Sequence, residues 1–177
     1  MKFSATKLAG VFVVSLEPHS DERGFFARTY CAGEFARAGI NFQSTQINIS
    51  RNDAAFTLRG MHWQAAPHAE AKLVRCVRGR IFDVVADIRP ESTTYLDWVG
   101  LKLDADKGDA LFVPEGCAHG FLTLTPSVDV LYQMGRPFAP GNADGFRFDD
   151  PAFAIDWPHP PKIVSAADLA WTPWRDR

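Results

Sequence analysis

Throughout the sequence, short apolar or alternating runs end at a Gly, Pro, Asp or Asn residue. Thirteen Gly and 12 Pro residues supply much of this punctuation. Runs of about 4 to 8 residues have the length of β-strands, whereas an amphipathic helix needs a longer periodic segment. The pattern therefore predicts an all-β sandwich or barrel, with strands at residues 11–16, 45–50, 58–63, 73–77, 81–88, 98–103, 110–113, 119–124 and 128–134.

Helical periodicity is weak in this sequence. Only residues 33–38 and 166–169 are expected to form a turn or two of helix. Gly79 is expected to make the tight turn of a hairpin. From Pro137 onward the chain is dense in Pro, Gly, Asp and aromatic residues, so this tail is expected to wrap the body as irregular structure. A length of 177 residues suits a single domain, residues 1–177, with one sizeable core.

Charge and composition exclude several classes of protein. Nineteen Lys and Arg residues against 21 Asp and Glu residues give a net charge of −2. Nucleic-acid and anionic-membrane binding usually leave a basic sequence, so neither partner is expected. No apolar run approaches the roughly 20 residues that span a bilayer. Three cysteines without a CxxC spacing, Cys31, Cys76 and Cys117, favour a reducing, cytoplasmic location over a disulfide framework or a zinc knuckle.

Two of the five histidines, His62 and His119, interrupt apolar runs. A lone strand histidine is most often a core residue whose nitrogens are hydrogen-bonded. Here Arg59 and Lys72 enter neighbouring runs, and a lysine is almost never fully buried without a partner, so these charges are expected to face a cavity. Strict alternation would place Arg59 and His62 on opposite faces of a strand. If both line one site, Gly60 must allow a bulge or twist.

The residues leave two further questions open. One is a metal site, for which the scattered donors are His62, His68, Glu70 and His119. The close His-x-His pair of many metal-binding β-barrel enzymes is missing, so no bound metal is expected. The other question is Tyr132, which is either a core side chain or a general acid set opposite a histidine base.

Several motifs along the chain resemble those of one enzyme family. They are DERGFF at 21–26, LRGMH at 58–62, KLVR at 72–75, PEG at 114–116 with AHGF at 118–121, LY at 131–132, and DDP at 149–151 with IDWP at 155–158. In this order they are similar to dTDP-4-dehydrorhamnose 3,5-epimerase and its deoxysugar-epimerase relatives, over residues 11–168. The resemblance implies a cupin-type jelly roll (a double-stranded β-helix), a homodimer, and no metal or organic cofactor.

The resemblance also implies roles for individual residues. His62 corresponds to the general base, Tyr132 to the general acid, and Asp168 to the carboxylate that orients His62. The implied substrate is a nucleotide-linked 4-keto-6-deoxy sugar, converted as from dTDP-4-dehydro-6-deoxyglucose to dTDP-4-dehydrorhamnose by epimerisation at C3, C5 or both. The residues expected to contact this substrate are Arg23, Arg28, Gln46, Asn48, Arg59, Lys72 and His119.

The implied chemistry is physically coherent. A 4-keto group acidifies the hydrogens on C3 and C5, and an imidazole held by a carboxylate can remove one of them. The enolate places negative charge on the C4 oxygen, where Lys72 or His119 could stabilise it. Tyr132 then returns a proton from the opposite face. Guanidinium groups suit a pyrophosphate, so a cluster of cations is expected to face it: Arg23, Arg28, Arg51, Arg59 and Lys72.

The sequence departs from the family at positions that the family uses for nucleotide or phosphate. Arg28 and Ala143 stand where the family usually has Glu, Ala167 stands where it often has Lys, and residues 51–56 are one residue longer. Reversal of charge at Arg28 favours a different base or a new contact. Two alternatives to the epimerase therefore stay open: a metal-dependent cupin enzyme and a non-catalytic sugar-nucleotide-binding module.

Overall fold

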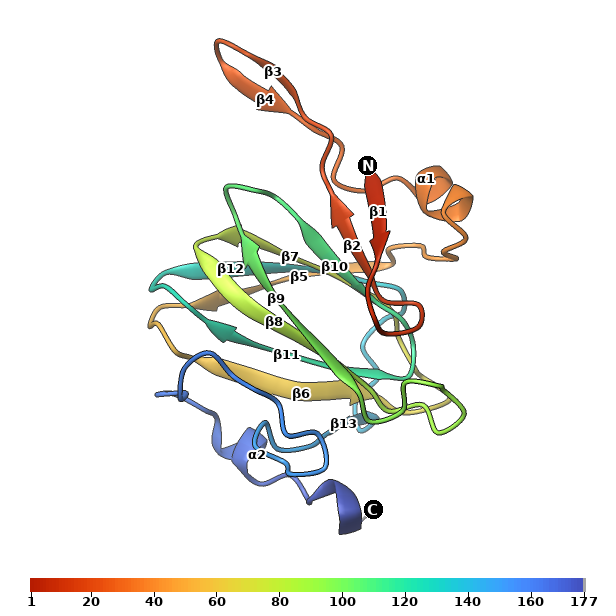
Figure 1. Ribbon diagram of the computed structural model, residues 1–177, viewed down its shortest axis with the longest axis vertical. Coiled ribbons are helices and arrows are strands. Elements are labelled where there is room, and N and C mark those ends of the chain that lie inside the picture. Colours follow the sequence, from red (N-terminus) through yellow and green to blue (C-terminus); the bar gives the residue numbers. More distant parts are fainter. Residues whose placement is uncertain (177) are drawn as a thin grey trace.

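The computed structural model describes residues 1–176 and consists mainly of antiparallel β-strands (Figure 1). One sheet has the order β1 (Lys2–Ala5), β2 (Phe12–Ser15), β10 (Ala110–Val113), β7 (Lys72–Arg78), β12 (Val128–Met134) and β5 (Gln46–Asn52). The second has the order β13 (Ala143–Gly145), β6 (Leu58–Gln64), β11 (Cys117–Thr123), β8 (Arg80–Asp87) and β9 (Trp98–Asp104). The remaining elements are the hairpin of β3 (His19–Asp21) and β4 (Gly24–Phe26), the helices α1 (Ala32–Arg37) and α2 (Ala166–Leu169), and the 3-10 turn η1 (Trp174–Asp176).

The main core lies between the two sheets. Val74 from β7 and Val130 from β12 pack in one cluster with Val85 from β8 and Phe121 from β11, and all four side chains are fully buried. In β12, Val128 and Val130 belong to this cluster and Tyr132 packs against it, at alternating positions along the strand, as the period of two in the run 128–134 predicts. The all-β, two-sheet prediction is confirmed.

The C-terminal tail covers the outer face of the five-stranded sheet (Figure 1). Phe146 and Phe153 stack with ring centroids 4.0 Å apart, and they pack against Met61, Val84 and Ala118 from the sheet. Burial of these aromatic rings attaches a segment that has little regular structure of its own. The expectation of a wrapping, mostly irregular tail is confirmed, apart from the short strand β13 and the helix α2.

Each run predicted as a strand is a strand, with ends that differ by at most two residues, and both predicted helical turns are present. The strands that the pattern missed are β1, β3, β4 and β13. All six residues of β3 and β4 are exposed, so no alternation of apolar and polar residues marks them. Within residues 1–176, no helix combines the length and the apolar character needed to cross a membrane. Arg177, the last residue of the expected domain, lies outside the described residues.

Glycines set two of the turns and bends that shape the sheets. Gly79 has φ +75° between β7 and β8, and a Cβ there would lie 2.6 Å from Thr125 Oγ1, so the expected tight turn is present. The prediction that it closes a hairpin is wrong, because the chain passes there from one sheet to the other and β7 does not pair with β8. Gly60 has φ +122°, and a Cβ there would lie 2.5 Å from the Cα of Gly120. The pairing of β6 with β11 shifts register at this point, between His119 opposite His62 and Phe121 opposite Arg59. This is the predicted bulge, and it brings Arg59 and His62 to one cavity.

Candidate active site

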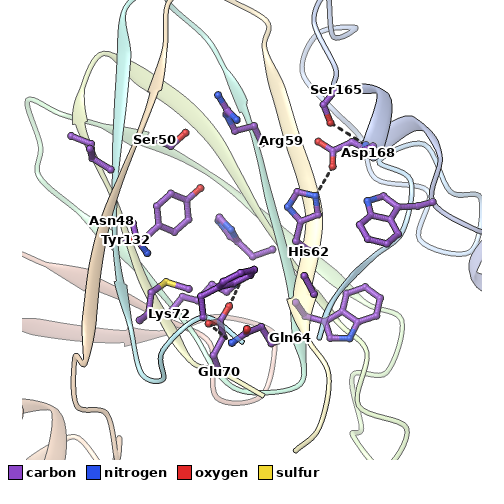
Figure 2. A pocket seen from close by; sticks show the side chains of 18 residues that line it. Asn48, Ser50, Arg59, His62, Gln64, Glu70, Lys72, Tyr132, Ser165 and Asp168 are labelled. Atoms are coloured by element: carbon purple, nitrogen blue, oxygen red, sulfur yellow. Dashed lines mark hydrogen bonds and ion pairs between the residues drawn. The ribbon is translucent and has the colours of Figure 1, made fainter. Parts of the chain in front are cut away.

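A cavity of about 540 Å³ lies between the two sheets (Figure 2). Its walls come from β5, β7 and β12 of one sheet, from β6 and β11 of the other, and from α2 in the tail. This volume falls within the roughly 300–1,000 Å³ typical of pockets for small ligands. Seven of the ten residues expected at the site line it: Asn48, Arg59, His62, Lys72, His119, Tyr132 and Asp168.

His62 and Asp168 form a hydrogen-bonded pair at one wall, with 2.5 Å between Nε2 and Oδ1. Ser165 caps α2 by accepting the backbone N–H of Asp168, which fixes the carboxylate beside β6. Burial by itself would raise the pKa of Asp168, but the hydrogen bond and charge of His62 outweigh it and hold that pKa below its ordinary value. The ionised carboxylate accepts the proton on Nε2, which leaves Nδ1 as the nitrogen with a free lone pair.

Tyr132 projects from β12 on the opposite wall of the cavity, facing the His62 side (Figure 2). Burial raises the pKa of its phenol well above the ordinary value; Asp83 raises it further, whereas Arg59 lowers it. The phenol therefore keeps its proton at neutral pH. A core tyrosine would be expected to find a partner for its hydroxyl. Tyr132 lines the cavity instead of lying wholly within the core.

His119 is held between Tyr132 and a buried carboxylate. Its Nε2 lies 2.8 Å from Oδ1 of Asp83, and its ring meets Tyr132 edge-on at 5.8 Å. Asp83 is fully buried, and its second oxygen, Oδ2, has no hydrogen-bond partner within residues 1–176. Asp83 was not among the residues expected at the site, although a carboxylate inside the apolar run 81–88 indicates that it needs a partner.

Lys72 is also paired with a carboxylate inside the cavity. Its Nζ lies 3.2 Å from Oε1 of Glu70, and both side chains are buried. Glu70 in turn accepts a hydrogen bond from the amide of Gln64 at 2.8 Å. Lys72 therefore lines the cavity, as expected, and the carboxylate of Glu70 lies beside it.

Polar residues on β5 and β6 line the rest of the cavity. Arg59 donates through Nε to Oδ1 of Asn52 at 2.7 Å, which holds its guanidinium at the end of β6. Gln46 does not line the cavity itself, but it donates to Oδ1 of Asn48 at 3.1 Å. Gln46 also accepts the backbone N–H of Phe138, whose exposed ring borders the cavity. Gln46 thus positions two lining residues.

Arg23 and Arg28 lie away from the cavity. Arg23 sits on the hairpin of β3 and β4, which extends from the sheets (Figure 1), and it pairs with Asp21. Arg28 pairs with Glu34 of α1 at 2.6 Å. The predicted cluster of five cations is therefore not formed within this chain, because the hairpin carries Arg23 outward and both Arg28 and Arg51 pair with nearby carboxylates. Only Arg59 and Lys72 of that set line the cavity.

The four donors considered for a metal site are not gathered around one point. Within residues 1–176, no group of three or more His, Cys, Asp or Glu side chains is arranged to hold a metal ion. His62 and His119 each face a carboxylate of their own, and Glu70 faces Lys72. His68 lies in the loop after β6 and does not line the cavity.

Trp171 also lines the cavity, although it was not among the residues expected at the site. Its ring lies edge-on to His62, with centroids 6.1 Å apart, and it borders the cavity. Its indole Nε1 is buried and has no hydrogen-bond partner within residues 1–176. No local pattern marks Trp171, because only the packing of the tail against β6 brings it to the cavity.

Solved structures with the same fold establish the class of protein. This chain superposes on dTDP-4-dehydrorhamnose 3,5-epimerase from Elizabethkingia anophelis with a TM-score of 0.96 and 32% identity, and the superposition covers 100% of this chain and 98% of the other. It also superposes on dTDP-6-deoxy-D-glucose-3,5-epimerase from Legionella pneumophila, which was solved in complex with dTDP-4-keto-L-rhamnose. The TM-score is 0.91 at 32% identity, and the superposition covers 97% of this chain and 92% of the other. The fold and the cavity therefore define an epimerase with a cupin-like, two-sheet architecture.

Sequence comparison narrows the class to one family. The family model described as dTDP-4-dehydrorhamnose 3,5-epimerase matches residues 5–176. A dTDP-4-dehydrorhamnose 3,5-epimerase from Methanothermobacter thermautotrophicus is 37% identical over 178 residues, which cover 99% of this chain and 95% of the relative. The chain belongs to the dTDP-4-dehydrorhamnose 3,5-epimerase family, as the motifs in its sequence indicated.

Proposed function

We propose that this chain epimerises a nucleotide-linked 4-keto-6-deoxy sugar at C3 and C5, with dTDP-4-dehydro-6-deoxyglucose as the substrate type. One observation carries the proposal: His62, held by Asp168, and the protonated phenol of Tyr132 stand on opposite walls of one cavity. Inversion of a carbon centre needs a base on one face and an acid on the other. The names of the family and of its relatives supply the substrate type.

Proton removal is the first step of the proposed reaction. The 4-keto group acidifies the C–H bonds at C3 and C5, and Nδ1 of His62 takes one of these protons. The electron pair of that bond forms an enolate with negative charge on the C4 oxygen. Asp168 stabilises the resulting imidazolium through the hydrogen bond at Nε2. The step changes no oxidation state, so it needs no redox cofactor, and the proposed reaction uses the side chains of the cavity for the acid–base chemistry.

Stabilisation of the enolate and return of the proton follow. Lys72 and His119 line the cavity as donors that can face the C4 oxygen. Tyr132 then donates its phenolic proton to the opposite face of the carbon, which inverts the centre. Because burial raises the pKa of Tyr132, the phenol stays protonated until the enolate carbon accepts that proton. Solvent exchange afterwards restores the imidazole and the phenol.

Recognition of the nucleotide part is assigned to the polar and cationic side chains. Arg59 and Asn48 line the cavity, Gln46 donates to Asn48, and Asn52 of β5 holds the Arg59 side chain. The guanidinium of Arg59 suits a pyrophosphate. Arg23 and Arg28 do not reach the cavity of their own chain. Their proposed contact with substrate therefore requires the cavity of a second copy.

A homodimer is the assembly that we propose. β5 is an edge strand of the six-stranded sheet, and it exposes Ile47 and Ile49 by 61% and 63%. The hairpin exposes Phe25 and Phe26 by 61% and 77%. An open edge with apolar side chains is a surface that proteins usually cover by association.

Sedimentation analysis tests the dimer. The purified protein is expected to sediment with about twice the 19.6 kDa mass of one chain. Phe26→Asp is expected to shift it toward the monomer, because it places a charge in the proposed apolar contact. Tyr95→Asp, on a different exposed surface, is the matched control and should leave the mass unchanged. A wild-type protein that stays monomeric at all concentrations would contradict the proposed assembly.

A reducing compartment and a single domain complete the proposal. Cys31, Cys76 and Cys117 are free thiols. Burial raises the pKa of Cys76 to about 11 and that of Cys117 to about 12, so these two thiols are unreactive. Free thiols support a cytoplasmic location. The family match over residues 5–176 supports residues 1–177 acting as one cupin-type epimerase domain.

Solvent deuterium exchange tests the function. The protein is incubated in D₂O with 4-keto-6-deoxy sugars linked to dTDP, GDP, CDP and UDP, and NMR follows C3 and C5. Deuterium is expected at both carbons of the dTDP sugar. Binding without exchange would instead favour the sugar-nucleotide-binding module, and stoichiometric metal whose removal stops the exchange would favour a metal-dependent cupin enzyme.

A further inference from the structure

A buried carboxylate–ammonium pair lies inside the cavity, and the proposed chemistry uses only half of it. Glu70 and Lys72 are two residues apart, where the loop after β6 enters β7. Oε1 of Glu70 lies 3.2 Å from Nζ of Lys72, and the two side chains are only 5% and 8% exposed. Burial of two charges is costly unless each is well paired and hydrogen-bonded. Such a pair at a cavity wall therefore needs a reason.

Gln64 fixes Glu70 in place. The backbone N–H of Ala139 donates to Oε1 of Gln64 at 2.7 Å, which determines the orientation of the amide because only its oxygen can accept. Nε2 of Gln64 then donates to Oε2 of Glu70 at 2.8 Å. Each oxygen of Glu70 thus accepts from a different donor. Gln64 lies two residues after His62 on β6, so the same strand carries the proposed base and the anchor of Glu70.

Burial and Glu70 have opposite effects on the charge of Lys72. Burial lowers the pKa of the Lys72 ammonium, while the charge and the hydrogen bond of Glu70 act against that shift. The backbone neighbours of Lys72 on the adjacent strands are Val113 on β10 and Met134 on β12, neither of which carries a charge. The other titratable groups that line the cavity are Arg59, His62, His119, Tyr132 and Asp168. Asp168 and the carboxylate of Asp83 behind His119 are each engaged by a histidine.

We propose that Glu70 is a positioning residue, which holds the Lys72 ammonium charged and fixed at the cavity wall where the enolate oxygen forms. The role in catalysis rests on the function proposed above, whereas the coupling of Glu70 to Lys72 does not. A fixed cation stabilises developing negative charge without reorganisation during the reaction. Without the carboxylate, the desolvated amine loses its proton at lower pH and loses its fixed position.

The coupling is tested directly on the lysine. Wild type, Glu70→Gln, Glu70→Asp and the surface control Glu91→Gln are labelled with ¹³Cε-lysine, and Lys72→Met assigns the Lys72 resonance. NMR titration then gives the pKa of Lys72 in each protein. Glu70→Gln removes the charge but keeps the shape, so the Lys72 pKa is expected to fall by about one unit or more. Glu70→Asp should restore most of that fall, and Glu91→Gln should leave the pKa unchanged.

Activity gives the second readout. If the amine must be charged, the alkaline limb of the pH profile of kcat/KM should move to lower pH in Glu70→Gln, by the same amount as the Lys72 pKa. Near the acid end of the profile most of the activity should return. In a Lys72→Met background, the additional loss from Glu70→Gln should shrink to less than about twofold, because the two residues act as a unit.

The outcomes separate the two proposals. An unchanged Lys72 pKa in Glu70→Gln overturns the positioning role, even if activity or the melting temperature falls, because a merely structural role would have that result. A shifted Lys72 pKa with an unmoved alkaline limb overturns the catalytic part. A wild-type protein that exchanges no deuterium with any nucleotide sugar overturns the proposed function, and the NMR titration still decides whether Glu70 controls Lys72.

Discussion

His62→Ala is expected to lower solvent deuterium incorporation at both C3 and C5 by about 10³-fold or more. A positioned general base typically contributes about 10²–10⁴-fold to a rate. His119 is the other imidazole that lines the cavity, but it packs against Tyr132 and pairs with Asp83, so we do not expect it to replace His62. One imidazole is proposed to serve both carbons, so both exchange reactions should fall together. The measurement is NMR of the dTDP-linked 4-keto sugar in D₂O.

His68→Ala is the matched control for this variant. His68 is exposed, lies outside the cavity, and was one of the donors considered for a metal site. Exchange in His68→Ala should equal that of the wild type. Equal losses in both variants would favour the metal-dependent alternative. Circular dichroism checks the fold, because removal of His62 leaves the Asp168 carboxylate without its partner. Exchange at the wild-type rate in a folded His62→Ala protein would rule out the proposed base.

Tyr132→Phe is expected to separate proton removal from inversion. The base is intact in this variant, so deuterium should still exchange from the face that His62 contacts. The acid on the opposite wall is missing, so formation of the epimerised product should fall by about 10²–10⁴-fold. NMR of the same sample distinguishes deuterium in the unepimerised sugar from deuterium in the product.

Tyr95→Phe is the corresponding control, since Tyr95 is exposed and does not line the cavity. Both exchange and inversion should be unchanged in it. If Tyr132→Phe inverts the sugar at the wild-type rate, the proposed acid is wrong and another donor must act from that wall. Because the ring is retained, the packing of Tyr132 against His119 should survive the change.

The strands were largely predictable because their signal is local. An alternating run such as 128–134 records which side chains face the core. Turn-formers mark the ends of strands, as Gly79 does between β7 and β8. The β3–β4 hairpin was not predictable in this way because its side chains are all exposed. Its Phe25 and Phe26 gave an apolar signal without alternation, and nothing in the sequence said that they project from the body.

The sequence indicated which residues form the candidate site, but not which residues contact one another there. The resemblance named His62, Tyr132 and Asp168, and their roles stay predictions, although all three line one cavity. The bulge at Gly60 was predicted because strict alternation would place Arg59 and His62 on opposite faces of the strand, although both were expected at one site. The register shift between β6 and β11 allows both to line the cavity. The expectation that five cations gather was wrong for the single chain. Each arginine of the set that lies outside the cavity pairs with a nearby carboxylate. The pattern of charges along the sequence does not determine these pairs.

The sequence by itself determined the two-sheet β-fold and the family, because strand alternation and short motifs are local properties of the chain. Only the tertiary structure decided which distant residues meet. Asp168 reaches His62 across 106 positions because the tail packs its aromatic rings on the outer face of a sheet. Glu70, which resembled a possible metal ligand in the sequence, is instead the partner of Lys72. Such pairings depend on how the sheets and loops close around the cavity, and desolvation there determines which charges must be paired.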